Sequence, residues 1–345
     1  MSEMRALLVE TARRAMRAPT DRLWSTLEEA GLTRAAIAEA KGGVGSDFGD
    51  WVAILRVVGE EALMAPLAET MLASVMLSEA GLDVPTGKLT LAPVTRGALP
   101  TLARAGSGWR LSGATRFVPW AREASFITVV AEFDGRLFVA RAGIAGNAVT
   151  RAENVAGEPR DEVELDALDV AEAAPAPFPR EAPFLLGALA RAATMAGALD
   201  AVRDLTVRYC GERQQFGRPI GKFQAIQQQV AELAAHVAAA GAAVDAAASA
   251  AERAPAPFEI AVAKARASEA AGLVAATAHQ VHGAMGFTRE HRLNLFTRRL
   301  WAWREDFGDE CFWWSWLGRI VARRGGDGFW PFLASTDKAA QVPFP

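Results

Sequence analysis

The feature that most constrains the fold is a change in the spacing of apolar residues, which occurs twice along the chain. In the first 86 residues, segments such as DRLWSTLEEAGL and PLAETMLASVMLSEAG place apolar residues three or four positions apart, which predicts helices. From Leu89 the spacing becomes two, in short segments such as SFITVVAEF and RLFVAR, which predict β-strands. From Ala182 to about Arg324 the helical spacing returns. The sequence therefore predicts an α+β fold in which strands separate two helical regions.

These changes divide the chain into four expected parts. They are an N-terminal helical domain at residues 1–86, a β domain at 87–172, a C-terminal helical bundle at 182–324 and a tail at 325–345. Short strands joined by glycine turns predict a small antiparallel barrel or sandwich. Asp134-Gly135 is typical of a type I′ hairpin turn, in which both positions have positive φ. The proline-rich segment EAAPAPFPRE predicts a linker, and the Gly- and Pro-rich tail predicts loose order.

Composition excludes several classes of function. The formal charge is −3 with both signs interspersed, which argues against nucleic acid as a partner. Two cysteines cannot form a disulfide framework or a thiolate zinc site, and the histidine spacing predicts no metal centre. No apolar run reaches the ~18 residues that span a bilayer. The N-terminus lacks a signal-type apolar stretch, so we expect a cytoplasmic protein without a membrane partner.

The most informative segment is YCGERQQFGRPIGKFQAIQ, which starts at Tyr209. It predicts a helix that is interrupted by a Gly-Arg-Pro-Ile-Gly loop and then restarts. Arg213 lies at the interruption, where a guanidinium can offer two parallel hydrogen bonds to a phosphate. Taken alone the pattern is weak, because most arginines at helix ends are simply solvated.

A second segment, QVHGAMGF from Gln280, changes that interpretation because the two segments together resemble the acyl-CoA dehydrogenase family. The family has a glycine where this chain has Ala284. The N-terminal segment EAKGGVGSDFGDWVAILRVVGEEAL is similar to a third family segment. The resemblance covers most of the chain and is strongest in residues 182–310. His282, inside the second segment, is either a nucleotide contact or a structural histidine.

The resemblance implies a helical domain, a β domain and a four-helix bundle, with FAD at a subunit interface. It places Arg213 at the pyrophosphate of FAD bound mainly to a neighbouring subunit, and Phe216 and Gln224 along the same cofactor. It places Gln280 and Gly283 near the adenosine half. The implied reaction removes the α-proton of an acyl-CoA thioester and transfers a hydride from Cβ to the flavin. Electrons then pass to an electron-transfer flavoprotein.

The catalytic base is missing from both positions at which the family places its glutamate. Counting from the Gly-x-Gly-Phe turn, the first position is Phe307, followed by Gly308. Asp306 stands one residue earlier, and one residue rotates a helical side chain by about 100°. The second position, on the first helix of the bundle, is Gly187. Asp306 is the candidate base that the sequence offers, and the base is otherwise unknown.

The β domain departs from the family pattern as well. The loop after Thr95 is shorter than the segment that shelters flavin and substrate in the family. Phe117-Val118-Pro119 stands where the family has a flavin-contacting W-x-T/S, and a proline has no N–H to donate.

Retention of the pyrophosphate and adenosine elements beside an eroded flavin-ring site favours a heteromeric enzyme. We expect an α2β2 assembly in which this chain is the subunit without the base, similar to two-gene dehydrogenases of steroid side-chain CoA thioesters. Two alternatives stay open. One is a complete homomeric dehydrogenase or oxidase with Asp306 as the base, and the other is a non-catalytic scaffold subunit.

Overall fold

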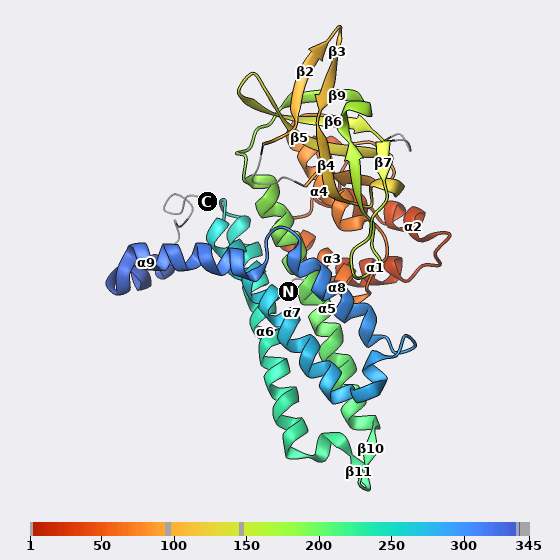
Figure 1. Ribbon diagram of the computed structural model, residues 1–345, viewed down its shortest axis with the longest axis vertical. Helices are drawn as coiled ribbons and strands as arrows, with labels where there is room; N and C mark the ends of the chain where they lie inside the picture. The colour runs from red at the N-terminus through yellow and green to blue at the C-terminus, as the bar shows by residue number, and fades with distance from the viewer. Residues whose placement is uncertain (1–2, 94–97, 145–147, 336–337, 339–345) are drawn as a thin grey trace. The chain divides into compact units, whose positions relative to one another are not determined.

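The computed structural model describes residues 3–93, 98–144, 148–335 and 338 (Figure 1). By its internal contacts the chain forms two compact units. Unit 1 comprises Met1–Asp47 and Met64–Gly187, and unit 2 comprises Phe48–Leu63 and Ala188–Pro345. The four-part division predicted from the sequence stays a prediction.

The described residues of unit 1 form three α-helices and nine strands. The helices are α1 (Glu3–Met16), α2 (Leu23–Glu29) and α4 (Leu67–Glu79). The strands are β1 (Leu89–Leu91), β2 (Thr101–Ala105), β3 (Gly108–Ser112), β4 (Ala114–Pro119), β5 (Phe126–Phe133), β6 (Arg136–Gly143), β7 (Val149–Thr150), β8 (Arg160–Glu164) and β9 (Asp169–Pro175).

The strands of unit 1 form a small barrel with a second sheet (Figure 1). Strand β5 pairs with β2, β2 with β3, β3 with β9, β9 with β6, and β6 again with β5. The ring of pairings is therefore closed, which leaves no free edge among these five strands. Strands β1 and β2 run parallel to β5, so the sheet is mixed, whereas β4, β8 and β7 form an antiparallel sheet.

The predicted hairpin turn between β5 and β6 is confirmed. Asp134 and Gly135 have φ of 54° and 69°, and Phe133 pairs with Arg136 across the turn. Inward-facing residues of both strands are fully buried, because alternate side chains of a strand point to the same face. The barrel core includes Leu111, Ile127, Val129, Ala131, Ala140, Ala142, Val163 and Leu165.

Unit 2 is a bundle of long helices. It contains α3 (Phe48–Glu60), most of α5 (Ala182–Glu212), α6 (Gln224–Ala251), α7 (Pro257–His282), α8 (Leu293–Glu305) and α9 (Glu310–Ala334). A hairpin of β10 (Gln214–Gln215) and β11 (Arg218–Pro219) joins α5 to α6 at one end of the bundle (Figure 1).

Helix α3 is held in this bundle by a close crossing with α5. A Cβ on Gly59 would meet the carbonyl oxygen of Thr194 at 1.8 Å, and one on Gly197 would meet that of Arg56 at 1.8 Å. Only glycine permits such an approach of two helix backbones. Arg56 adds ion pairs to Asp200 of α5 and to Asp245 of α6.

Two expectations for irregular segments were wrong. The first residues of the expected linker belong to β9, which continues to Pro175 and pairs with β6. In the expected loose tail, α9 continues to Ala334 across a kink at Gly325, where φ is 67°. The buried ring of Phe332 packs on Phe258 of α7 at 4.9 Å, and this contact orders the segment. The rest of the tail, apart from Lys338, lies outside the described residues.

In the part of the chain that the structure describes, two helices are long and apolar enough to cross a membrane by length and composition alone. The most apolar 18-residue windows of α5 and α6 have mean hydropathies of 1.4 and 1.3. The sequence prediction concerned unbroken apolar runs only, whereas these values are means over 18 residues. In α5, 83% of the window is buried inside the protein, as in the core helix of a bundle.

Candidate functional site

The first wall of the candidate site is the hairpin between α5 and α6. Gln214 pairs with Pro219 and Gln215 with Arg218, so the interruption is a hairpin with Phe216 and Gly217 in its turn. Arg218 and Pro219 of the predicted Gly-Arg-Pro-Ile-Gly loop form its second strand. Both turn residues have positive φ, 51° and 76°, as a type I′ turn requires. Phe216 is an unusual residue in this conformation, and its side chain is 90% exposed.

The second wall is the C-terminal end of α7. The helix ends at His282, and a 3₁₀ turn over Gly283–Phe287 follows. Gly283 has φ 57° and ψ −142°, a combination that residues with a side chain avoid. A glycine is therefore required at this position of the second motif.

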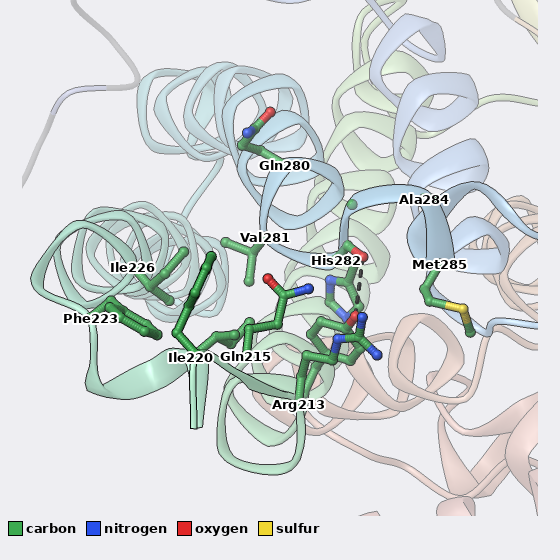
Figure 2. A pocket seen from close by; sticks show the side chains of 13 residues that line it. Arg213, Gln215, Ile220, Phe223, Ile226, Gln280, Val281, His282, Ala284 and Met285 are labelled. Atoms are coloured by element: carbon green, nitrogen blue, oxygen red, sulfur yellow. Dashed lines mark hydrogen bonds between the residues drawn. The ribbon is translucent and has the colours of Figure 1, made fainter. Parts of the chain in front are cut away.

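These two walls enclose a cavity of about 520 Å³ within unit 2 (Figure 2). Four of the five residues predicted to bind FAD line it: Arg213, Phe216, Gln280 and Gly283. Further lining residues are Tyr209, Gln215, Ile220, Phe223, Ile226, Val281, His282, Ala284 and Met285. The fifth predicted residue, Gln224, is exposed at the start of α6 and lies outside the lining.

The polar groups of this cavity are those that an anionic nucleotide needs. The backbone of Arg213 is fixed, because its N–H donates to Tyr209 O and its carbonyl accepts from Ile220 N–H. Its exposed side chain has no hydrogen bond or ion pair with any described residue. A guanidinium supplies five donors in a rigid fork that matches phosphate oxygens. The exposed carboxamides of Gln215 and Gln280 add donors and acceptors, so the residues present fit a diphosphate-containing cofactor.

Most of the apolar residues that line the cavity were not predicted from the sequence to belong to the site. Ile220, Ile226 and Val281 are single apolar residues of three different helical segments, and such a residue is expected for core packing as much as for a cavity wall. Tyr209 was part of the first motif, but no role was assigned to it.

The candidate base Asp306 lies elsewhere in unit 2, between α8 and α9. It is the C-cap of α8, and its Oδ2 lies 3.1 Å from Nε of the buried Arg191 of α5. The next residue, Phe307, has φ 55°, and its carbonyl accepts a hydrogen bond from Trp313 Nε1 at 3.1 Å. Asp306 as a base stays a prediction.

The segment of residues 304–308, called the 304–308 turn below, is fastened by a buried lysine of α7. The Nζ of Lys264 donates to Arg304 O at 2.8 Å and to Gly308 O at 2.7 Å, and lies 2.9 Å from Ser268 Oγ. Its side chain is fully buried, and this burial lowers the pKa of Lys264 to about 7 against the opposing charge of Asp306. No feature of the sequence singled out Lys264, because the burial of a lysine depends on the tertiary fold.

In unit 1, the segment that stands in for the flavin-contacting W-x-T/S is irregular. The pairing of β4 with β8 shifts between Thr115 and Val118, and Phe117 in this bulge has φ 58° and is 70% exposed. Pro119 ends the strand. The loop after Thr95 lies partly outside the described residues.

Comparison with known proteins identifies the family. Residues 180–305 match the C-terminal domain of acyl-CoA dehydrogenases. The acyl-CoA dehydrogenase FadE27 of Mycobacterium tuberculosis is 30% identical over 301 residues, 79% of this chain and 81% of the relative. The chain belongs to the acyl-CoA dehydrogenase family. The resemblance inferred from the two motifs is therefore confirmed.

Solved structures of the acyl-CoA dehydrogenase fold agree with the architecture. The Tcur3481–Tcur3483 steroid acyl-CoA dehydrogenase G363A variant superposes with a TM-score of 0.80 and 26% identity, over 93% of this chain and 98% of that one. The ChsE4–ChsE5 complex from Mycobacterium tuberculosis superposes with a TM-score of 0.82 and 24% identity, over 93% and 98% of the two chains. The predicted fold class is thus confirmed.

Proposed function

We propose that this acyl-CoA dehydrogenase chain works as a subunit that supplies the pyrophosphate and adenosine half-site for FAD bound mainly to a partner subunit. The observation that carries the proposal is Arg213, whose guanidinium lies in the cavity with no partner among the described residues. Phe216, beside it, is held at positive φ with its ring almost wholly in solvent. Such a conformation is costly, and it is expected where a ligand or partner makes use of it.

The proposed binding roles are those that the family resemblance implies for the residues that line the cavity. Arg213 would hold the pyrophosphate, Gln280 and Gly283 the adenosine half, and Phe216 an adjoining part of the cofactor. Gln224 would reach the cofactor only from outside the cavity, as the residue that opens α6. Bound FAD would accept the hydride when an acyl-CoA thioester is dehydrogenated.

The heteromeric part of the proposal rests on the position of the missing base. Phe307 occupies the position of the family's glutamate and cannot take a proton, and Asp306 beside it is paired with Arg191. In the heteromeric assembly, a carboxylate from another chain would take the α-proton. The similar ChsE4–ChsE5 structure is a complex, and the similar Tcur3481–Tcur3483 protein is a steroid acyl-CoA dehydrogenase. We therefore propose an α2β2 assembly, an acyl-CoA thioester of the steroid side-chain type as substrate, and an electron-transfer flavoprotein as acceptor.

The visible absorption spectrum tests this proposal, recorded on the purified chain alone and after its co-expression with a candidate partner subunit of the acyl-CoA dehydrogenase family. We expect a colourless chain alone and a yellow complex. Replacing Arg213 by alanine should lower the affinity of the complex for FAD about 10- to 100-fold, since hydrogen bonds to charged groups contribute roughly 1.5–3 kcal/mol. A chain that purifies yellow by itself and is bleached by an acyl-CoA would overturn the heteromeric proposal. A complex that keeps its flavin without Arg213 would favour the scaffold role.

A further inference from the structure

The two walls of the candidate site come from distant parts of the chain, and one residue joins them. Tyr209 lies one helical turn before Arg213, whose N–H donates to the Tyr209 carbonyl at 2.9 Å. The ring of Tyr209 stacks on that of His282, the last residue of α7, with centroids 4.4 Å apart and planes inclined by 24°. The Tyr209 hydroxyl donates to His282 O at 3.3 Å. Carbonyls at a helix end lack helical partners, so this bond satisfies one of them.

His282 is itself held in a single orientation. Its ring is 2% exposed, and its Nδ1 lies 2.8 Å from Ala278 O, which requires the proton on Nδ1. The Nε2 atom is buried and has no hydrogen-bond partner among the described residues. Burial lowers the pKa of His282, the hydrogen bond to Ala278 opposes this shift, and the neighbouring His291 and His279 lower the pKa further.

A third ring completes the packing of His282. His291 meets it edge-on, with centroids 4.8 Å apart and planes inclined by 64°. The Nδ1 of His291 accepts a hydrogen bond from Leu293 N–H at 3.2 Å, so His291 is held by its own backbone. The ring of His282 is therefore fixed by stacking on one side, an edge contact on another and a hydrogen bond to its own helix.

We propose that Tyr209 and His282 are positioning residues of the nucleotide site, which fix the helix end that carries Arg213 against the helix end that carries Gln280 and Gly283. The proposal rests on the proposed function, because it assigns these residues to the same FAD half-site. Tyr209 and His282 connect residues that would contact the pyrophosphate with residues that would contact the adenosine half. Loss of the connection should lower FAD affinity while Arg213 is still present.

The affinity for FAD of the complex, or of the chain alone if that retains flavin, tests the proposal in four variants. Y209L removes the ring, and we expect about a 10-fold loss, since an aromatic pair contributes roughly 0.5–1.5 kcal/mol. Y209F keeps the ring and loses only a long hydrogen bond, so it should bind within about threefold of the wild type. F332L breaks a buried ring pair between α9 and α7 in the same unit and should leave FAD affinity unchanged. R213A measures the half-site itself.

The pattern of losses separates the two proposals. If R213A and Y209L both lose FAD while Y209F and F332L retain it, the positioning role is supported. If R213A loses FAD and Y209L does not, Tyr209 has no positioning role and the proposed function stands. If neither loses FAD, the proposed function is overturned together with this inference. A loss in F332L equal to that in Y209L would also overturn the positioning role, because a general effect of destabilisation would explain both.

A spectroscopic measurement on the chain alone covers the case in which Y209L does not fold. The chain contains one tyrosine, so biosynthetic 3-fluorotyrosine gives a single ¹⁹F resonance. H282F keeps a stacked ring, whereas H282N keeps a donor near the Nδ1 position and loses the ring. We expect the resonance to move toward that of the denatured chain in H282N and to stay near its native position in H282F. An unchanged resonance in H282N would show that the stack does not hold Tyr209, and the inference would fail.

Discussion

The candidate nucleotide site and the 304–308 turn lie in the same unit, but their polar groups are satisfied in opposite ways. At the site, the guanidinium of Arg213 is exposed and bonded to no described residue. At the turn, Lys264 is fully buried, and Nζ makes hydrogen bonds to two backbone carbonyls. Trp313 holds a third carbonyl, that of Phe307.

This difference in hydrogen bonding indicates that the candidate nucleotide site can bind a ligand, whereas the 304–308 turn is held in one conformation. A buried donor with all its acceptors present has nothing left to offer a ligand. An exposed guanidinium on a hydrogen-bonded backbone retains its whole hydrogen-bonding capacity. The candidate nucleotide site is therefore open to a ligand, whereas the 304–308 turn around Phe307 is held by hydrogen bonds within the chain.

The largest expected effect is on stability, when the fastening of the turn is removed. In K264A the carbonyls of Arg304 and Gly308 lose their donor, and each unsatisfied buried carbonyl costs about 1–3 kcal/mol. We expect a loss of roughly 3 kcal/mol in the free energy of unfolding, measured by urea denaturation followed by circular dichroism. K222A at the exposed Lys222 beside the hairpin is the matched control and should change it by less than about 0.5 kcal/mol. Equal effects of the two substitutions would contradict the comparison.

The same lysine should make stability depend on pH. In the folded chain burial lowers the pKa of Lys264 to about 7, whereas in the unfolded chain it returns to the ordinary 10.5. Between these values the unfolded chain binds the additional proton, so raising the pH stabilises the folded state, by up to about 1.4 kcal/mol per pH unit. Urea unfolding from pH 7 to pH 10 should show this gain in the wild type relative to K264A. A difference between the two proteins that does not vary with pH would contradict it.

The parts of the fold that depend on local sequence were predicted. Asp134-Gly135 forms the expected turn because two residues with positive φ specify it locally. The two motifs lie about seventy positions apart in the sequence and meet in one cavity. Their proximity could be predicted because the two motifs bind one cofactor in the family that they resemble.

The parts that depend on tertiary contacts were not predicted. Strand β2 (Thr101–Ala105) has one buried residue, Leu102, so its sequence lacks the apolar alternation of a strand. This segment forms a strand because it pairs with β3. Many helices end at a glycine, so Gly325 predicts the end of a helix. Instead, α9 continues beyond Gly325, where Phe332 packs on Phe258. The role of Lys264 could not be predicted for the same reason, because its burial depends on tertiary packing.

A smaller effect is expected at Asp306, and it sharpens the comparison. D306N removes the charge that pairs with Arg191, which is buried, so the free energy of unfolding should fall by about 1 kcal/mol. If the turn is a fastened segment without a catalytic role, kcat/KM of the complex should stay within about threefold of the wild type. A fall of several hundredfold with flavin content unchanged would instead identify Asp306 as the base of a homomeric enzyme.

The smallest effect on the chain itself is expected at the tip of the hairpin. The ring of Phe216 is 90% exposed, so F216A removes almost no buried apolar area and should change the free energy of unfolding by less than about 0.5 kcal/mol. Phe223 is the matched control, because its ring packs against the buried cluster of Cys210, Ile220 and Val281, and F223A should cost roughly 1–2 kcal/mol. Although it barely changes stability, F216A should lower the flavin content of the complex, because Phe216 lines the candidate cavity. If F216A instead destabilises the chain as much as F223A, the ring is part of the bundle's own packing, and the hairpin tip is not the open region that the comparison requires.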